Sequence, residues 1–235
     1  MRTFIRDILY GLRIAFKNPI MLITSTACLG IGIGIFLLMF IPLNTLMIKP
    51  LPFTDSHELI WVHESHPKHN YQIMSVSYLN YLDWKSSITC VEELAAFMKQ
   101  DISVERGETS QRIVGTYVTR DFFKLLDLSP DFGQFPDSKD DWIDSDGMEK
   151  IVISYSFWSR YFDKGPVINE TIILGGISHR IVGIMPENYE IPSGSDVWMR
   201  LRLDPQAIPR DTHFLWVIGR LRNDVSLNEA SAQIQ

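Results

Sequence analysis

The chain has 235 residues, of which 46% are hydrophobic, and this length suffices for one sizeable folded domain or two small ones. The formal net charge of −6 argues against a nucleic-acid-binding protein, because contacts with phosphates require an excess of Lys and Arg. Only two cysteines occur, Cys28 inside an apolar run and Cys90 far downstream, and this excludes a secreted domain held together by disulfides.

The first segment has an apolar stripe and a basic flank. Apolar residues recur every four positions at Phe4, Ile8, Leu12 and Phe16, and the basic residues that lie off this stripe are Arg2, Arg6, Arg13 and Lys17. This spacing predicts an amphipathic helix over residues 1–18 that lies on the cytoplasmic surface of a membrane. A helix packed against a partner protein is the alternative, and the pattern is compatible with both.

An uncharged run follows, from Lys17 to Lys49. About 20 residues of helix cross the hydrocarbon core of a bilayer, so the run predicts one transmembrane helix over residues 19–48. A signal peptide would have an apolar region of about 7–15 residues, which is shorter than this one. The basic flank places the N-terminus in the cytoplasm and the residues after about 49 outside it.

Glycines recur inside this run as LGIGIG at residues 29–34. A dinucleotide-binding loop is excluded, because no strand precedes the motif. Gly30 and Gly34 have the spacing that allows two transmembrane helices to approach closely, so they are our candidates for helix packing.

Short strands then alternate with helices, which predicts an α+β domain of two small subdomains. We expect helices over 77–97, around 121–126 and around the aromatic residues of 155–162. We expect strands over 59–63, 112–118, 151–154, 196–203 and 213–221. Residues 170–174 and 179–184 form a predicted hairpin around the turn 175–178.

The end of the chain predicts the start of one more helix. Ser226 and Glu229 have the spacing of a capping box, and the helix would have barely begun its second turn at Gln235. We therefore expect the domain over 49–235 to be truncated at its C-terminus.

Two groups of side chains are possible metal ligands. His63, His66 and His69 lie three apart, but Pro67 indicates a loop, in which this spacing does not align side chains. The acidic stretch between Asp137 and Asp146 resembles a calcium loop. However, Trp142 and Ile153 occupy positions that need ligands, so we expect no metal site.

Catalytic motifs are missing from the sequence. Ser154 could be combined with His179 or His213, but no G-x-S-x-G elbow and no phosphate-binding loop occur. Five of the six tryptophans are spread one per element, which is typical of core filling: Trp61, Trp84, Trp158, Trp198 and Trp216. We therefore expect no enzyme activity and no cofactor.

Several short segments, in order along nearly the whole chain, resemble one family. They are YGLRIAFKNP at 10–19, LGIGIG at 29–34, IKPLPF at 48–53, YLDW at 81–84, VTRDFFKLLDLSP at 118–130, ISYSFWSRYF at 153–162, HRIVGIMPENYEIP at 179–192, DVWMRL at 196–201 and VIGRLRNDVSLNEA at 217–230. The order is similar to the N-terminal half of ABC-transporter permeases of the MacB/FtsX type. It is most similar to the large permease group of acidobacteria.

The resemblance implies a MacB-like periplasmic core domain over 49–235 in a protein of the bacterial inner membrane. It also implies a non-catalytic permease part that pairs with a cytoplasmic ABC ATPase and works as a homodimer or as a heterodimer with another permease. Membrane lipid is the other expected partner, and nucleic acid is not expected. Such permeases have further transmembrane helices near the C-terminus, and their absence predicts a fragment, a split gene or a degraded copy. IFLLMF at 35–40 is also more apolar than in relatives. The alternative is a stand-alone, membrane-anchored binding or sensor module without ATP coupling.

Overall fold

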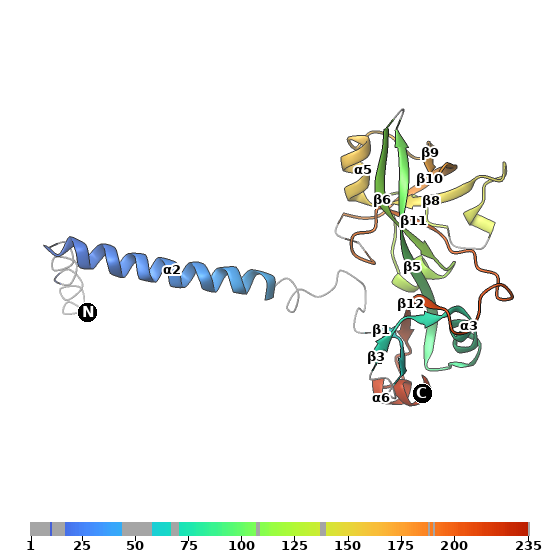
Figure 1. Ribbon diagram of the computed structural model, residues 1–235, viewed down its shortest axis with the longest axis horizontal. Coiled ribbons are helices and arrows are strands. Elements are labelled where there is room, and N and C mark those ends of the chain that lie inside the picture. Colours follow the sequence, from blue (N-terminus) through green and yellow to red (C-terminus); the bar gives the residue numbers. More distant parts are fainter. Residues whose placement is uncertain are drawn as a thin grey trace. The chain divides into compact units, whose positions relative to one another are not determined.

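The structure, a computed structural model, describes residues 10, 17–43, 58–66, 71–106, 109–136, 140–187, 189 and 191–234. The chain divides into two compact units, Met1–Leu51 and Pro52–Gln235. Each unit is described by itself below (Figure 1).

The described part of the first unit is chiefly one helix, α2, over Pro19–Leu43. Proline suits the first position of a helix because its missing N–H would have no partner there. Large apolar side chains of α2 are exposed from Ile20 to Leu38. Counting only the described residues, the structure contains no helix that is both long and apolar enough to span a bilayer. The predicted amphipathic helix falls almost wholly outside the described residues.

The described part of the second unit consists of strands, four α-helices and one 3₁₀ turn. Its strands are β1 (Leu59–Val62), β2 (Glu64–His66), β3 (Tyr71–Met74), β4 (Val76–Ser77), β5 (Val91–Arg106), β6 (Thr109–Val118), β7 (Phe132–Gly133), β8 (Glu149–Ile153), β9 (Thr171–Leu174), β10 (Ile177–Ile184), β11 (Val197–Arg200) and β12 (His213–Leu221). Its helices are α3 (Tyr78–Ser87), α4 (Phe122–Leu126), α5 (Tyr155–Phe162) and α6 (Leu227–Ile234), with a 3₁₀ turn, η4, at Asp140–Trp142.

Six strands close into a barrel in the order β5–β6–β11–β8–β10–β9. Closure follows because β9 pairs with both β10 and β5. The pairs β11–β6 and β10–β8 are parallel and the others antiparallel, so the barrel is mixed. Its inward-facing side chains form one buried cluster with α5, which includes Ile151, Ile153, Phe157, Ile181 and Val197. The predicted α+β class is confirmed.

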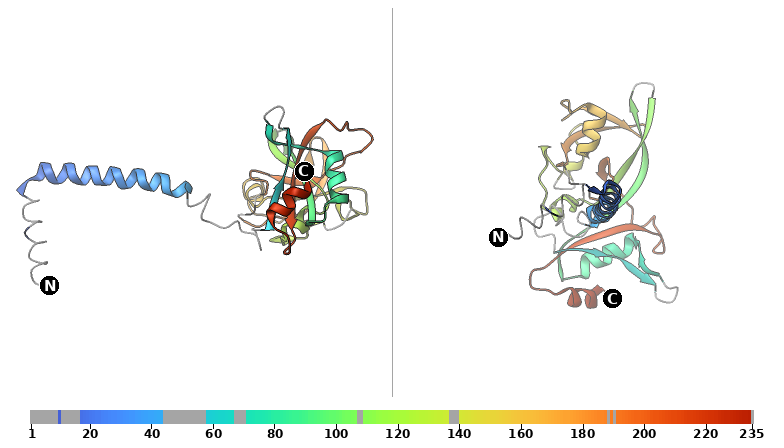
Figure 2. Two further views of the ribbon diagram at one scale, coloured as in Figure 1. Left: turned by 90° about the horizontal axis from the view of Figure 1, so that it is seen from below. Right: turned by 90° about the vertical axis from the view of Figure 1, so that its left-hand side faces the viewer.

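The other half of the domain is an open antiparallel sheet, β1–β12–β5. Helix α3 lies between β1 and β5 in the chain, and β12, which α6 follows, lies between these two strands in the sheet. This is a split βαβ arrangement. One buried cluster joins this sheet to α3 through Tyr81, Leu94 and Val217. Ala230 of α6 packs in a smaller cluster with Cys90 and Leu221. Figures 1 and 2 show α5 beside the barrel and α3 and α6 beside the open sheet.

The two halves share β5. Its first part, from Val91 to Phe97, pairs with β12, and its second part, from Phe97 to Arg106, pairs with β6. The cluster around α4 lies where the two parts meet and contains Ala95, Phe97, Val118, Phe122, Phe123, Leu125, Leu126, Phe135, Trp142, Val152, Met185, Trp198 and Ile218. The predicted subdomains are therefore joined by a continuous strand and a common core.

Two predicted elements differ from the structure. The helix expected over 77–97 ends at Ser87, and Val91 begins the longest strand. The apolar side chain of Leu94 fits a helical period, but pairing with β12 and β6 determines the fold there. The hairpin turn is only Gly175–Gly176, because both residues have positive φ angles (58° and 80°), which suit a two-residue turn.

Candidate functional site

Two of the histidines considered above as possible metal ligands lie on or beside strands. His63 and His66 are exposed at the end of β1 and in β2, while His69 lies outside the described residues. Within the described ranges, no group of three or more His, Cys, Asp or Glu side chains could hold a metal ion.

Each residue of the possible hydrolytic set has a separate structural role. Ser154 caps the N-terminus of α5, where its hydroxyl oxygen accepts the Phe157 N–H. His179 lies beside the Ile177 carbonyl oxygen on β10. His213 lies between Glu64, at 2.8 Å from its Nε2, and the carbonyl oxygen of Asp211. The structure brings no Ser–His–Asp triad together from these residues.

The acidic stretch pairs with an arginine. Asp144 and Asp146 accept hydrogen bonds from the two terminal nitrogens of Arg180 on β10. Asp137 and the side chain of Asp140 lie outside the described residues. Two of the acidic side chains that resembled a calcium loop therefore neutralise Arg180.

A polar network connects the two halves of the domain. Lys85 of α3 donates hydrogen bonds to Asp121, at the N-terminus of α4, and to the Leu94 carbonyl oxygen and the Tyr81 hydroxyl. Lys85 and Asp121 have side chains only 30% and 12% exposed. We call this set of Tyr81, Lys85 and Asp121 the waist network.

Two side chains of the waist network have raised pKa values. Burial raises the pKa of Tyr81. Burial alone would lower the pKa of Lys85, but the hydrogen bond with Asp121 and the neighbouring Tyr81 and Asp121 charges raise it overall. Both groups therefore hold their protons more tightly in the folded protein.

The other end of α4 is held by an arginine. Arg220 of β12 donates from Nε and one terminal nitrogen to the Leu125 carbonyl oxygen, at 3.1 and 2.8 Å. Its other terminal nitrogen lies 3.1 Å from Glu58, just before β1. Helix α4 is thus bonded at both ends to the open-sheet half.

The tryptophans are not all in the core. Trp158 and Trp198 are buried, but Trp61 is 59% exposed and Trp216 is 44% exposed, so the prediction of core filling was wrong for these two. Both lie on the α4 face of the open sheet, where Trp61 is opposite Ile218 and Trp216 opposite Phe97. Five residues of α4 cover only about 7.5 Å, which leaves this part of the face open.

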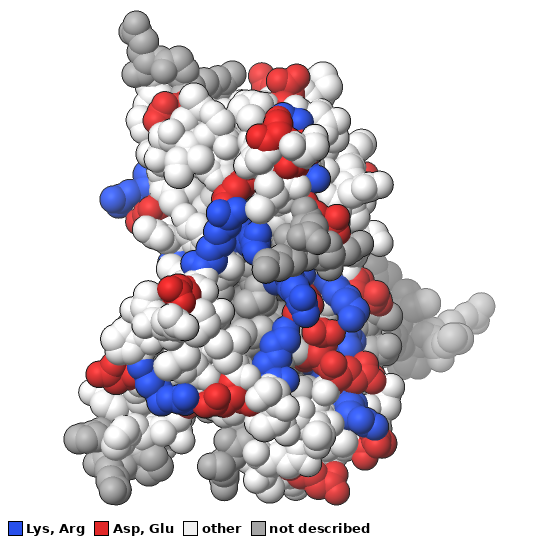
Figure 3. All heavy atoms as spheres, turned by 90° about the vertical axis from the view of Figure 1, so that its right-hand side faces the viewer, with Lys and Arg blue, Asp and Glu red and all other residues white. Residues whose placement is uncertain are grey.

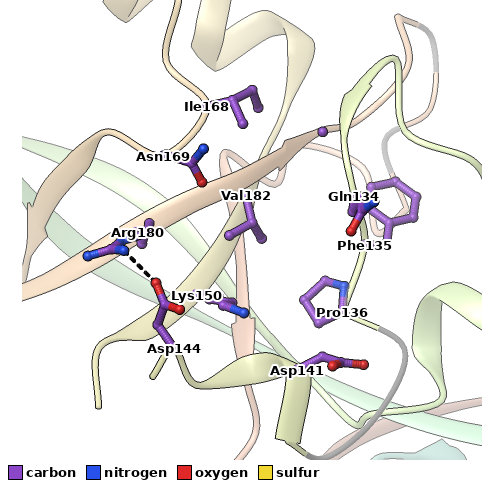
Figure 4. A pocket seen from close by; sticks show the side chains of 11 residues that line it. Gln134, Phe135, Pro136, Asp141, Asp144, Lys150, Ile168, Asn169, Arg180 and Val182 are labelled. Atoms are coloured by element: carbon purple, nitrogen blue, oxygen red, sulfur yellow. Dashed lines mark hydrogen bonds and ion pairs between the residues drawn. The ribbon is translucent and has the colours of Figure 1, made fainter. Parts of the chain in front are cut away.

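A polar pocket of about 530 Å³ lies on the outer face of the barrel (Figure 4). Arg180 and Lys150, which pair across β10 and β8, form one wall. The segment after β7, from Gln134 to Pro136, forms the opposite wall. Figure 3 shows that Lys and Arg side chains gather across the middle of one face of the domain, with Asp and Glu on both sides.

The helix-packing candidates lie in α2. A Cβ added to Gly30 or Gly34 would have no described atom of another element within 4 Å. The proposed contact with a second helix remains a prediction.

Sequence reasoning missed the waist network, Arg220 and Arg180. Lys85 and Asp121 are 36 residues apart, as are Arg180 and Asp144, and no local pattern marks such pairs. The one available signal was the charged pair Arg120–Asp121 directly before an apolar helix.

Comparison with known proteins gives one family. The profile of the MacB-like periplasmic core domain matches residues 23–235. No curated protein is detectably similar in sequence.

Three solved structures share the fold at low identity. The periplasmic region of MacB from Actinobacillus actinomycetemcomitans is 12% identical, with a TM-score of 0.55 over 75% of this chain and 79% of that one. The extracellular domain of YknZ, a noncanonic ABC-type transporter from Gram-positive bacteria, is 15% identical, with a TM-score of 0.51 over 75% and 87%. A domain of a putative permease from Porphyromonas gingivalis is 16% identical, with a TM-score of 0.52 over 80% and 84%.

Proposed function

We propose a function from the premise that the chain belongs to the family of MacB-like periplasmic core domains. We propose that it is the N-terminal part of the permease component of an ABC-type export or mechanotransmission system. In this role it carries movement from a cytoplasmic ATPase to a periplasmic domain and catalyses no reaction itself. The family match over residues 23–235 is the observation that carries the proposal.

The structure of the domain suits the transmission of force. A shared strand, β5, runs through both halves, and α4 is bonded at each end to the open-sheet half by Lys85 and Arg220. A displacement of the open sheet would therefore displace the barrel. Transmission of this kind needs rigid links and requires no catalytic side chain.

The membrane anchor is part of the same proposal. It rests on the uncharged run between Lys17 and Lys49, which extends beyond the described residues of α2, and on the exposed apolar side chains of that helix. The amphipathic segment 3–17 would contact the ATPase at the inner membrane surface. Gly30 and Gly34 would pack against another transmembrane helix, and the likeness to the acidobacterial permease group also remains a proposal.

Co-purification from membranes tests the proposal. The tagged chain should recover an ATP-binding subunit, which photolabelling with azido-ATP would identify. A variant without residues 3–17 should recover much less of this subunit while still reaching the membrane.

Recovery of the chain without any ATP-binding protein would contradict the permease function. A stand-alone anchored binding or sensor module would give this result, because it needs no nucleotide-binding partner.

A further inference from the structure

The two exposed tryptophans form one patch on the open sheet. Trp61 of β1 pairs with Ile218 of β12, and Trp216 lies two positions earlier on β12, so the two side chains are diagonal neighbours on one face. Phe97 of β5 pairs with Trp216, and its ring centroid lies 5.9 Å from that of Trp61. Phe97 is buried, whereas Trp61 and Trp216 are 59% and 44% exposed. Part of each indole ring therefore covers the core, and the rest is presented to the surroundings.

The indole N–H groups of this patch differ from those in the core. The buried Trp158 and Trp198 donate from Nε1 to backbone carbonyl oxygens, at 2.8 and 3.0 Å. Trp61 and Trp216 donate to no acceptor among the residues that the structure describes. An exposed apolar ring with one unused donor suits the boundary between a membrane and water, because hydrocarbon can contact the ring while headgroup oxygens accept the N–H.

The charged side chains beside the patch are compatible with a lipid surface. Arg220, two positions after Ile218 on β12, lies 3.1 Å from Glu58. Lys124 of α4 lies 3.1 Å from Glu93 of β5. Each of these cations has a carboxylate partner, so the two pairs add no net charge beside the patch and do not repel a headgroup layer.

The place of β1 in the chain limits its distance from the proposed membrane anchor. The uncharged run ends at Lys49, and β1 begins at Leu59. Ten residues of fully extended chain span at most about 36 Å, so β1 cannot lie farther than this from the end of the run. A short tether of this kind makes contact with the bilayer effectively intramolecular, and a weak contact then suffices.

We propose that Trp61 and Trp216 insert into the headgroup region of the bilayer in which the chain is anchored, so that this face of the open sheet docks on lipid. The inference rests on the membrane anchor of the proposed function and does not depend on coupling to an ATPase.

Quenching of tryptophan fluorescence tests this contact, because all six tryptophans lie after Lys49 and none lies in the proposed anchor. The full chain is placed in nanodiscs of phosphatidylcholine, with or without bromine atoms on the acyl chains near the headgroup. Bromine quenches only those indoles that it approaches closely. Brominated lipid should lower the emission by up to about a third, because two of the six tryptophans would contact it.

Matched variants locate the quenched residues. The double variant Trp61→Phe, Trp216→Phe should lose the quenching, and each single variant should lose part of it. Trp84→Phe is the control and should keep the quenching, because Trp84 lies in α3 and packs against the cluster on the other face of the sheet.

The proposal is overturned if the emission is the same in both lipids, as it would be if this face docked a protein instead. It is also overturned if the double variant, with an unchanged melting temperature, is quenched like the wild type. A chain that does not enter nanodiscs would overturn the membrane anchor and this inference together. Failure to recover an ATPase by co-purification would contradict only the permease function.

Discussion

At the scale of single residues, the waist network contains a charge pair that is mostly buried. Lys85 keeps its charge at a half-buried position because Asp121 and two neutral oxygens surround its ammonium group. Removing one partner of a pair like this is costly, because the other charge then remains buried without compensation.

We expect Asp121→Ala to lower the free energy of unfolding by about 2 kcal/mol. The matched control is Asp101→Ala, which removes an exposed ion pair with Arg112 and should cost less than about 1 kcal/mol. Urea unfolding of both variants measures the difference. Equal effects would show that the waist network does not stabilise the domain.

Alkaline pH should destabilise the same site. The pKa values of Tyr81 and Lys85 are raised in the folded protein, so the unfolded chain loses these protons at lower pH. Their contribution to stability is fully present below about pH 10 and is lost as the pH rises above it. Urea unfolding between pH 8 and 11 should show this decline. Tyr81→Phe should make it shallower, and an unchanged slope would contradict the assignment.

Few of these side-chain interactions could be predicted from the sequence. Local rules identified the Ser226–Glu229 capping box, in which Ser226 N–H donates to Glu229 and Glu229 N–H donates to Ser226. Pairs such as Lys85–Asp121 depend on the tertiary fold, so their spacing in sequence contains no signal.

At the scale of elements, β7 is held against β10 by two glycines. Gly133 has a φ angle of 79°, and a Cβ there would overlap the carbonyl oxygen of Val182. Its partner Gly183 would place a Cβ 2.8 Å from the Gln134 carbonyl oxygen. This close approach of β7 to β10 positions the segment from Gln134 to Pro136, which forms one wall of the polar pocket.

Gly133→Ala should therefore destabilise the domain by about 2–3 kcal/mol, since left-handed strain and a backbone clash add. Gly147→Ala is the matched control, because it has a φ angle of 85° but open space around the added Cβ. It should cost only about 1 kcal/mol. Thermal unfolding of both variants measures their losses of stability, and similar losses would rule out a backbone clash at position 133.

Elements with a clear local pattern could be predicted. The strand over 213–221 coincides with β12, and aromatic residues spaced along one face marked α5. The first part of β5 could not be predicted, because Leu94 and its neighbours also fit a helix. Pairing on both sides of that strand decides its structure.

At the scale of the whole molecule, the α+β class followed from alternating short elements, but the barrel did not. Closure depends on the pairing of β9 with both β10 and β5, in which Val104 pairs with Leu174, 70 residues later in the chain. The exposure of Trp61 and Trp216 depends equally on how far α4 extends. The resemblance of the short motifs to the MacB-like periplasmic core domain was confirmed by the match over residues 23–235.

The central claim is that ATP bound in the cytoplasm moves the periplasmic domain. Energy transfer in nanodiscs tests it directly, with a donor on Ser110→Cys in a Cys28→Ser, Cys90→Ala background and an acceptor on lipid headgroups. Ser110 is exposed at the start of β6, so the label should not disturb the barrel. With the co-purified ATPase present, ATP should change the transfer efficiency. An efficiency that is the same with and without ATP would contradict the account.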